Sequence, residues 1–285
     1  MELELKRGGR TARVETLGGE LVSYRDERGL EYIWGGDPAY WPGRNPLLFP
    51  IVGMLKEGKI RFDGREYAME RHGFARRREF TPAARGEDWV RLELRESAET
   101  LALYPYPFRL AVEQRLTDTG FSTAVTVANP GEGPLPFCLG AHTGFRCPLE
   151  AGERFEDYEL VFPERESCPT LLLRDGLLDR PAALPCLEDT DTLPLDYRWF
   201  DALDTLIFEG LRSRSVTLRS RKSGRGVRVS FDGFPMLAFW TMPGKKAPYL
   251  CIEPWHGCAA GTAEGPEFTD KAHCIVLAPG ESRTL

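Results

Sequence analysis

Hydrophobic and polar residues alternate along many short stretches of the chain. In residues 90–95, apolar side chains occupy every second position, and charged side chains occupy the positions between them. This period of two is typical of a half-buried β-strand, because successive side chains of a strand point to opposite faces of the sheet. Residues 1–5 alternate in the same way, so the chain is expected to begin with a strand.

Turn residues between alternating stretches predict antiparallel hairpins. Asp-Gly, Asn-Pro-Gly and Ser-Gly clusters interrupt the alternation at short intervals, as the turns of a β protein do. The predicted hairpins are 108–116 with 121–127, around Asp118-Thr119-Gly120, and 215–219 with 227–231, around Lys222-Ser223-Gly224. Two further strands are predicted at 236–240 and 275–277.

Helical periodicity is nearly absent from the chain. Residues 200–211 are compatible with one short helical turn before a strand, and residues 171–178 are ambiguous. Alternating strand–helix units and glycine-rich phosphate loops are also missing. The sequence therefore predicts an all-β fold, a large antiparallel β-sandwich. Because no linker-like stretch divides the chain, residues 1–285 are expected to form a single domain.

Composition and charge exclude several classes of protein. With 42% apolar and 28% charged residues, the chain is expected to fold. Its longest nearly apolar run, residues 46–55, contains Pro50 and Gly53 and is far shorter than the roughly 20 residues of a membrane helix. The net charge of −6 argues against a nucleic-acid partner, which would require a dominant basic surface.

The cysteines and the N-terminus indicate a cytoplasmic protein. Seven cysteines include no C-x-x-C pair, and their number is odd. The N-terminal residues alternate and do not form a basic segment followed by an apolar one, as a signal peptide would. We therefore expect reduced cysteines that act mostly as small buried apolar groups.

Two of the four histidines lie in unusual local sequences. His72 precedes Gly73 in an Arg-His-Gly-Phe-Ala-Arg segment, and His142 lies between Gly140 and Gly144. Small neighbours allow backbone and ring to approach an open surface closely. His72 and His142 are therefore the better histidine candidates for a functional site. A structural role is the default interpretation of His256 and His273, and a contact at the edge of the site is left open for His256.

Three charged residues interrupt apolar runs and are further candidates. Glu253 ends the apolar stretch 249–252, and Pro254 stops the strand directly after it. A carboxylate at the buried end of a strand is costly unless it is paired or has a functional role. Arg44 and Asp204 stand in similar positions, where a salt bridge and a ligand contact are equally compatible with the sequence.

These residue types favour general acid–base chemistry on a neutral polyol. Motifs of nucleophilic hydrolases and of zinc proteases are absent. No His/Glu pair has the local spacing of metal ligands, so no metal is predicted, although a site assembled from distant strands remains open. A glutamate could take a hydroxyl proton while a histidine protonates an ether oxygen. Four tryptophans could cover the C–H face of a sugar ring or belong to the core: Trp34, Trp41, Trp240 and Trp255.

Five segments, taken in order, resemble the aldose 1-epimerase (galactose mutarotase-like) family, and in particular its LacX-like branch. They are Arg44–Gly53, the segment His72-Gly73-Phe74-Ala75-Arg76, Gly140-Ala141-His142, Asp204-Thr205-Leu206 and Cys251-Ile252-Glu253-Pro254-Trp255. The likeness extends over nearly the whole chain. It implies a sandwich of the galactose mutarotase type that interconverts the α and β anomers of a free aldose without metal or organic cofactor.

The resemblance also implies a role for each candidate residue. Glu253 is the general base that takes the proton of the anomeric hydroxyl, and His142 is the acid that protonates the ring oxygen. His72 orients the sugar near that oxygen. Arg44 and Asp204 hold ring hydroxyls, while Arg71 and Trp255 are expected to contact the substrate.

Two departures from the family pattern leave alternatives open. Thr143 replaces the proline that usually follows the second histidine, and Arg71 replaces the amide residue that commonly precedes the first. The added positive charge keeps a hexose-6-phosphate mutarotase as an alternative, with Arg71, Arg76 or Arg77 near the phosphate. A sugar-binding or regulatory protein without turnover is the other alternative. The expected partner is a small sugar, and the protein is expected to be a monomer or a homodimer.

Overall fold

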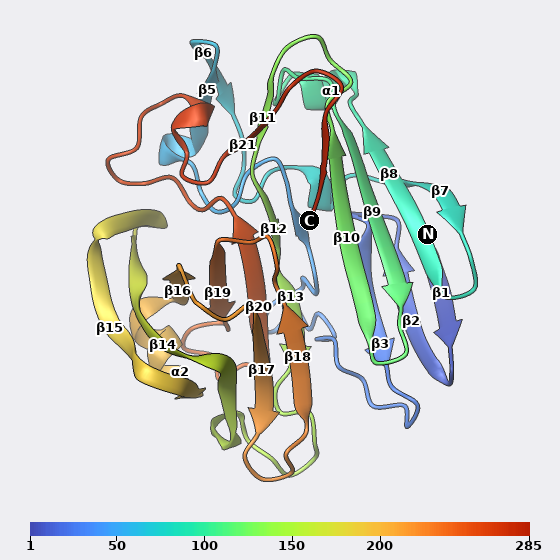
Figure 1. Cartoon of the computed structure of the whole chain (residues 1–285), viewed down its shortest axis with the longest axis vertical. Helices are drawn as coiled ribbons and strands as arrows, with labels where there is room; N and C mark the ends of the chain where they lie inside the picture. The colour runs from blue at the N-terminus through green and yellow to red at the C-terminus, as the bar shows by residue number, and fades with distance from the viewer.

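The alternating stretches form strands, and the turn residues connect them into hairpins. A computed structural model describes all 285 residues and shows the antiparallel β architecture that the sequence predicts (Figure 1). The strands are β1 (Glu2–Arg7), β2 (Arg10–Glu15), β3 (Glu20–Arg25), β4 (Leu47–Leu48), β5 (Lys59–Phe62), β6 (Arg65–Ala68), β7 (Thr81–Arg85), β8 (Trp89–Arg95), β9 (Arg109–Leu116), β10 (Phe121–Ala128), β11 (Leu135–Phe137), β12 (Leu139–Ala141), β13 (Thr143–Arg146), β14 (Tyr158–Arg174), β15 (Leu177–Pro194), β16 (Thr205–Glu209), β17 (Ser215–Ser220), β18 (Gly226–Ser230), β19 (Met236–Trp240), β20 (Tyr249–His256), β21 (Ile275–Leu277) and β22 (Ser282–Thr284).

Helices are few and short. The two α-helices are α1 (Ala98–Leu101) and α2 (Tyr197–Leu203). Helix α2 leads directly into β16, which confirms the short helical turn before a strand. The ambiguous residues 171–178 belong to the long β14–β15 hairpin and its tip. Neither α-helix has the length and the apolar character that crossing a bilayer requires.

The largest sheet carries the candidate site. It contains ten strands and runs in the order β18-β17-β14-β16-β19-β20-β12-β4, with β13 also paired to β20 and β15 to β14. Its strand pairs are antiparallel. A five-stranded sheet, β22-β10-β9-β8-β7, forms the other layer of the sandwich, and β1 and β2 of a three-stranded sheet contact β9.

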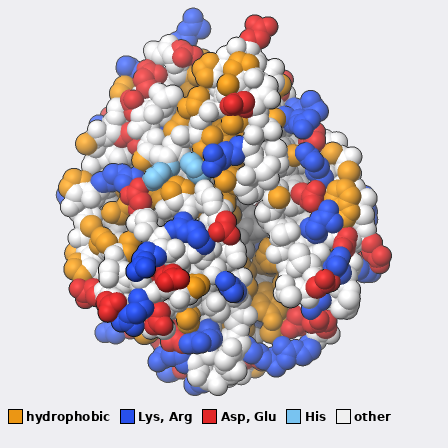
Figure 2. All heavy atoms as spheres, in the orientation of Figure 1, with side chains coloured by type: hydrophobic (Ala, Val, Ile, Leu, Met, Phe, Trp, Pro, Cys, Tyr) orange, Lys and Arg blue, Asp and Glu red, His pale blue; other side chains and the backbone are white.

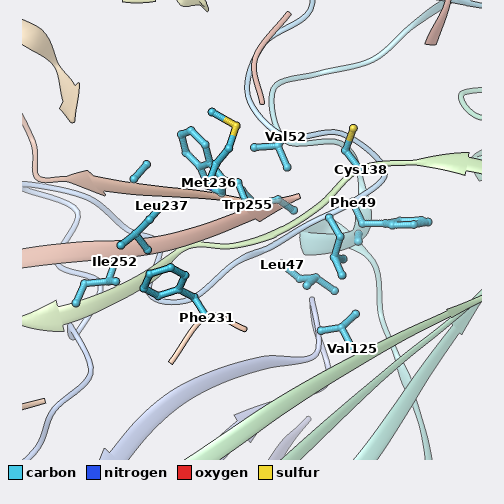
Figure 3. Packing of buried hydrophobic residues seen from close by; sticks show 14 of the residues in the cluster. Leu47, Phe49, Val52, Val125, Cys138, Phe231, Met236, Leu237, Ile252 and Trp255 are labelled. Carbon is cyan, nitrogen blue, oxygen red and sulfur yellow. The ribbon is translucent and has the colours of Figure 1, made fainter. Parts of the chain in front are cut away.

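Apolar side chains of the facing sheets form the core. A cluster of 64 buried residues runs from Leu3 to Leu277 and includes members of every large sheet. Figure 3 shows part of it, with Leu237 and Ile252 of the ten-stranded sheet and Val125 of the five-stranded sheet. One continuous core agrees with a single domain, which stays a prediction.

A cavity of about 750 Å³ lies between the two layers, on the interior side of the central strands. Residues of β9, β10, β13, β18 and β20 line it, among them Val112, Thr123, Thr143, Val229 and Pro254. Figure 2 shows a hollow near the middle of one face of the molecule, with basic and acidic side chains interspersed around it. The interior face of the central strands thus borders this cavity, and the candidate site lies on their other face.

Candidate active site

The register of the central strands places His142 opposite Glu253. In the ladder with β20, β12 pairs Gly140 with Trp255, and β13 pairs Thr143 with Ile252. His142 stands between these two pairs, so its cross-strand neighbour in the same register is Glu253. Directly opposed residues of antiparallel strands have Cβ atoms roughly 4.5–5.5 Å apart. Strand pairing thus brings together two residues that are distant in sequence.

Strand alternation then separates the apolar face of β20 from the face that carries Glu253. Leu250, Ile252 and Pro254 face the core or the interior cavity. Cys251 and Glu253 consequently face the opposite side, because side chains two residues apart share a face. The sequence predicted a carboxylate at the buried end of an apolar strand, and Glu253 is indeed only 1% exposed.

His142 and Glu253 form a buried pair. Nε2 of His142 lies 3.2 Å from Oε1 of Glu253, and His142 is 8% exposed. Burial disfavours the charged form of each group. It raises the pKa of Glu253 well above its usual value and lowers the pKa of His142 to about 3. The same directions make an ionised Glu253 a strong base and a protonated His142 a strong acid.

Two groups near Glu253 affect the pKa of its carboxyl group. The Trp255 indole lies beside the carboxyl and partly offsets the rise in its pKa, although its Nε1 is too poorly aligned for a formed hydrogen bond. The negative charge of Asp204 adds to the rise. Asp204 is exposed at the end of α2, and its Oδ2 accepts a hydrogen bond from the Thr205 hydroxyl at 2.7 Å. An exposed carboxylate at this point can accept hydroxyl hydrogens of a ligand.

His72 comes to the pair from a separate loop. Its ring centroid lies 5.6 Å from that of His142, with the two rings nearly perpendicular. The Gly53 amide donates to Nδ1 of His72 at 3.1 Å, so in the neutral ring the proton is on Nε2. Burial lowers the pKa of His72 well below its usual value, and the nearby His142 and Arg76 add to that effect. His72 is therefore a neutral ring with a hydrogen-bond donor at Nε2.

Gly73 fixes the backbone of this loop. Its φ is +72°, and a Cβ at this position would stand 2.3 Å from the Phe49 carbonyl oxygen. That oxygen accepts hydrogen bonds from the Phe74 and Ala75 amides, so it cannot move away freely. The glycine next to His72, which drew attention in the sequence, is required by a close backbone approach.

We expect Gly73→Ala to lower the free energy of unfolding by at least about 2 kcal/mol, because backbone strain and a steric clash act together. Urea denaturation measures the change. Gly224→Ala is the matched control, since Gly224 also has a φ of +72° but no atom within 4 Å of its Cβ position. The control is expected to lose about 1 kcal/mol from strain alone. Equal losses in the two variants would contradict the close-approach explanation.

Aromatic rings surround His142. The Trp41 ring lies 4.9 Å from it at an interplanar angle of 33°, and the Trp240 ring lies 5.7 Å away, edge-on. Tyr249 and Trp34 continue this aromatic group as a small second apolar cluster. Gly144 makes the arrangement possible, since a Cβ there would stand 3.0 Å from the Trp41 ring. The rings offer flat apolar surfaces directly beside the acid–base pair.

Neither Arg44 nor Arg71 forms a hydrogen bond or an ion pair with His142 or Glu253. The Arg44 guanidinium donates to the Gly35 carbonyl at 3.1 Å and pairs with Glu15 at 3.5 Å, so no hydrogen bond or ion pair joins it to His142 or Glu253. Its backbone oxygen accepts from the Gly144 amide, which ties the Arg44 segment to β13. Arg71 is exposed next to His72, and its Nη2 lies 2.6 Å from the Met54 sulfur.

The tip of the β14–β15 hairpin reaches the Arg71 side of the site. A Cβ at Gly176 would contact both the Met54 sulfur and Nη2 of Arg71. Trp255, by contrast, is 6% exposed and packs in the core beside Val52 and Met236 (Figure 3). The structure thus places Arg71 on the surface beside His72, and Trp255 in the core beneath Glu253.

One reactive group beside His142 and Glu253, the Cys251 thiol, was not among the predicted site residues. Cys251 is buried and free, and its sulfur lies within 4.8 Å of ligand atoms of both His142 and Glu253. The signal was present in the sequence, because Cys251 and Glu253 are two residues apart on one strand and must share a face. The sequence alone did not single out Cys251, because its seven cysteines are equally compatible with small buried apolar groups.

Comparison with known proteins agrees with this arrangement. The family model described as aldose 1-epimerase matches residues 1–285. The chain belongs to the aldose 1-epimerase family. Two curated relatives are the plasmid-encoded and chromosomal LacX proteins of Lactococcus lactis subsp. lactis, which are 42% and 41% identical over 287 residues. Each of these matches covers 98% of this chain and 95% of the relative.

Solved structures of this family have the same fold. A galactose mutarotase related enzyme from Lactobacillus acidophilus has a TM-score of 0.95 at 28% identity, with 100% of this chain and 95% of that chain covered. A galactose mutarotase-like protein from Lactobacillus casei ATCC 334 has a TM-score of 0.93 at 27% identity, with 100% and 98% covered. The sandwich predicted from the sequence is therefore of the galactose mutarotase type.

Proposed function

We propose that this aldose 1-epimerase family member is a mutarotase that interconverts the α and β anomers of a free aldohexose. The observation that carries the proposal is the buried His142–Glu253 pair, with Nε2 and Oε1 3.2 Å apart. The two oxygens that exchange protons in a cyclic aldose, the anomeric hydroxyl and the ring oxygen, are bonded to the same carbon. An acid and a base that serve both oxygens must therefore be close neighbours, as these two side chains are.

Ring opening requires that the anomeric hydroxyl lose a proton and that the ring oxygen gain one. Glu253 takes the proton of the anomeric hydroxyl, the bond between C1 and the ring oxygen breaks, and His142 protonates the ring oxygen. The open-chain aldehyde then rotates about the C1–C2 bond and closes on its other face with the proton transfers reversed. Burial makes the carboxylate, once ionised, a stronger base and the imidazolium, once protonated, a stronger acid. The contact of 3.2 Å between the two groups favours the charged forms that the step needs, because opposite charges stabilise one another.

Neighbouring groups would orient the sugar. Nε2–H of His72 is available as a donor near the ring oxygen, and the exposed Asp204 carboxylate can accept from a ring hydroxyl. The Trp41 and Trp240 rings provide apolar surfaces for the C–H face of the sugar. Arg44 would need to exchange its contacts with Gly35 and Glu15 to reach a hydroxyl. Trp255 has a supporting position beneath Glu253 in this proposal.

Burial of the pair favours an enzyme over a protein that only binds sugar. A carboxyl group that is 1% exposed is costly to keep in an apolar environment, and sugar binding alone is served by exposed hydroxyl-binding groups. Such a pair with strongly shifted pKa values is typical of a catalytic site. The wild-type protein should therefore accelerate the optical-rotation change of freshly dissolved α-D-galactose or α-D-glucose in polarimetry.

A phosphorylated substrate is the second candidate, and Arg71 is the residue that favours it. Arg77 pairs with Glu70, and Nη2 of Arg76 donates to the Arg71 carbonyl, whereas Arg71 has no carboxylate partner. If the site takes an unphosphorylated aldose, Arg71→Met should change kcat/KM for glucose by less than about threefold. A phosphate-contacting Arg71 would instead give a preference for glucose 6-phosphate that Arg71→Met removes, by tenfold or more.

Polarimetry with glucose and with glucose 6-phosphate, each with wild type and Arg71→Met, separates the two candidates. Arg165→Met is the matched control, since this arginine is exposed and pairs with Asp189 on the β14–β15 hairpin. A preference for free glucose in wild type supports the first candidate. A wild-type preference for glucose 6-phosphate that depends on Arg71 contradicts it.

A further inference from the structure

Three side chains of metal-binding type, from two separate parts of the chain, converge at the His142–Glu253 pair. The ligand atoms of His142, Cys251 and Glu253 all lie within 4.8 Å of one another, and all three residues are buried. The convergence follows from the strand register. His142 stands opposite Glu253 across the β13–β20 ladder, and Cys251 precedes Glu253 by two residues on the same face of β20.

The three donor atoms favour Zn²⁺ over Mg²⁺ and Ca²⁺. A thiolate, an imidazole and a carboxylate are the ligands of Zn²⁺ sites, whereas Mg²⁺ and Ca²⁺ require oxygen donors. Zinc bonds of about 2.0–2.3 Å set tetrahedral ligand atoms roughly 3.3–3.8 Å apart. The His142–Glu253 separation of 3.2 Å is already close to that range. The Cys251 sulfur, which lies within 4.8 Å of the other two ligand atoms, would have to approach them by about 1 Å at most to reach that range.

We propose that a thiophilic divalent cation, Zn²⁺, binds to His142, Cys251 and Glu253. Three protein ligands leave a fourth position for water or a hydroxyl group. The thiol proton, and the proton of Glu253 where the carboxyl is protonated, are released to solvent as the metal–ligand bonds form. Because the ion occupies both members of the acid–base pair, binding blocks proton transfer. The inhibition part of this inference rests on the proposed function, and the binding part does not.

The surroundings of His142 indicate that the ion binds reversibly. Metal-ligating histidines usually donate their second ring nitrogen to a carboxylate or a carbonyl, and losing that partner weakens binding about 10–100-fold. The second nitrogen of His142, Nδ1, is buried and has no hydrogen-bond partner. The site therefore lacks the supporting contacts of a permanent zinc centre. The ion would act as a removable inhibitor that competes with the sugar, and a chelator would reverse its effect.

Direct metal binding tests the site without reference to activity. Titration of Zn²⁺ against a chromophoric chelator should show one ion bound per chain. Substituting Co²⁺ should produce a near-ultraviolet thiolate-to-cobalt absorption band, which reports sulfur ligation in the unaltered protein. Cys251→Ala should weaken zinc binding at least tenfold. Cys186→Ala, a partly exposed cysteine on β15, is the matched control and should bind as wild type does.

The outcomes for the zinc site and for the mutarotase are distinguishable. Absence of stoichiometric binding, absence of the cobalt–thiolate band, or unchanged binding by Cys251→Ala overturns the zinc site, whatever the activity. If mutarotation is observed but saturating Zn²⁺ leaves its rate unchanged, the inhibition is wrong and the mutarotase stands. If zinc binds through Cys251 and no mutarotation occurs, the site stands and the proposed function fails. Mg²⁺ at the same concentration should have no effect.

Discussion

Glu253→Gln is expected to lower the kcat of mutarotation at least about 100-fold. The substitution keeps the size of the side chain and removes only its ability to take a proton, and general-base catalysis typically contributes 10²–10⁴-fold. Polarimetry of freshly dissolved α-D-galactose or α-D-glucose measures the rate. The free energy of unfolding should not fall with the activity, because the amide has the size of the carboxyl group and places no charge in the buried site.

Glu166→Gln is the matched control for this prediction. Glu166 is equally buried, at 1% exposure, but its carboxylate accepts hydrogen bonds from the Arg212 and Ser213 amides in another part of the structure. We expect this control to lose stability and to keep its activity per folded molecule. If Glu253→Gln retained wild-type kcat, Glu253 would not be the base.

The second large effect is expected from His142→Asn, with a loss of kcat of about 100-fold or more. Asparagine keeps a polar group near the ring position but cannot donate a full proton to the ring oxygen. The combined variant Glu253→Gln/His142→Asn should be little worse than either single variant. Groups that act as one unit are strongly non-additive, because removing either member already disables the proton transfer.

His256→Asn is the control for the histidine. His256 ends β20, three residues after Glu253, and its Nδ1 lies 2.8 Å from the His273 carbonyl oxygen. Its contact is structural, so the kcat of this variant should stay within about twofold of wild type. Multiplicative losses in the Glu253/His142 double variant would contradict the pair mechanism and would indicate two independent contributions.

Much of the fold could be predicted from the sequence because its signals are local. Alternation identified β8, β9, β10, β17 and β18 nearly to their ends, since one face of each packs against the core. Short apolar runs next to turn residues identified β19 and β21. Residues 171–178, at the tip of the β14–β15 hairpin, were ambiguous because nearly all of their side chains are at least partly exposed, which weakens the period of two. Strand order and register were not predictable, because they depend on contacts between residues distant in sequence.

In the candidate site, too, local features were predictable and features set by distant contacts were not. Glu253, His142 and His72 were identified from local context, an acid ending an apolar strand and histidines beside glycines, and the structure brings all three together. Trp255 is buried beneath the site, because alternation places it on the functional face but packing against Val52 and Met236 encloses it. The Arg44 side chain lies against Gly35 and Glu15. Such side-chain directions are set by neighbours that a motif does not contain.

The central step of the proposed function is the opening and closing of a hemiacetal ring by the His142–Glu253 pair. Exchange between the α- and β-anomeric proton signals of an equilibrated aldose, followed by NMR magnetisation transfer, measures that step without any net reaction. With wild-type protein we expect the exchange rate to rise in proportion to protein concentration, and with Glu253→Gln to stay near the spontaneous rate. Wild-type exchange at the spontaneous rate for glucose, galactose and their 6-phosphates would contradict the account.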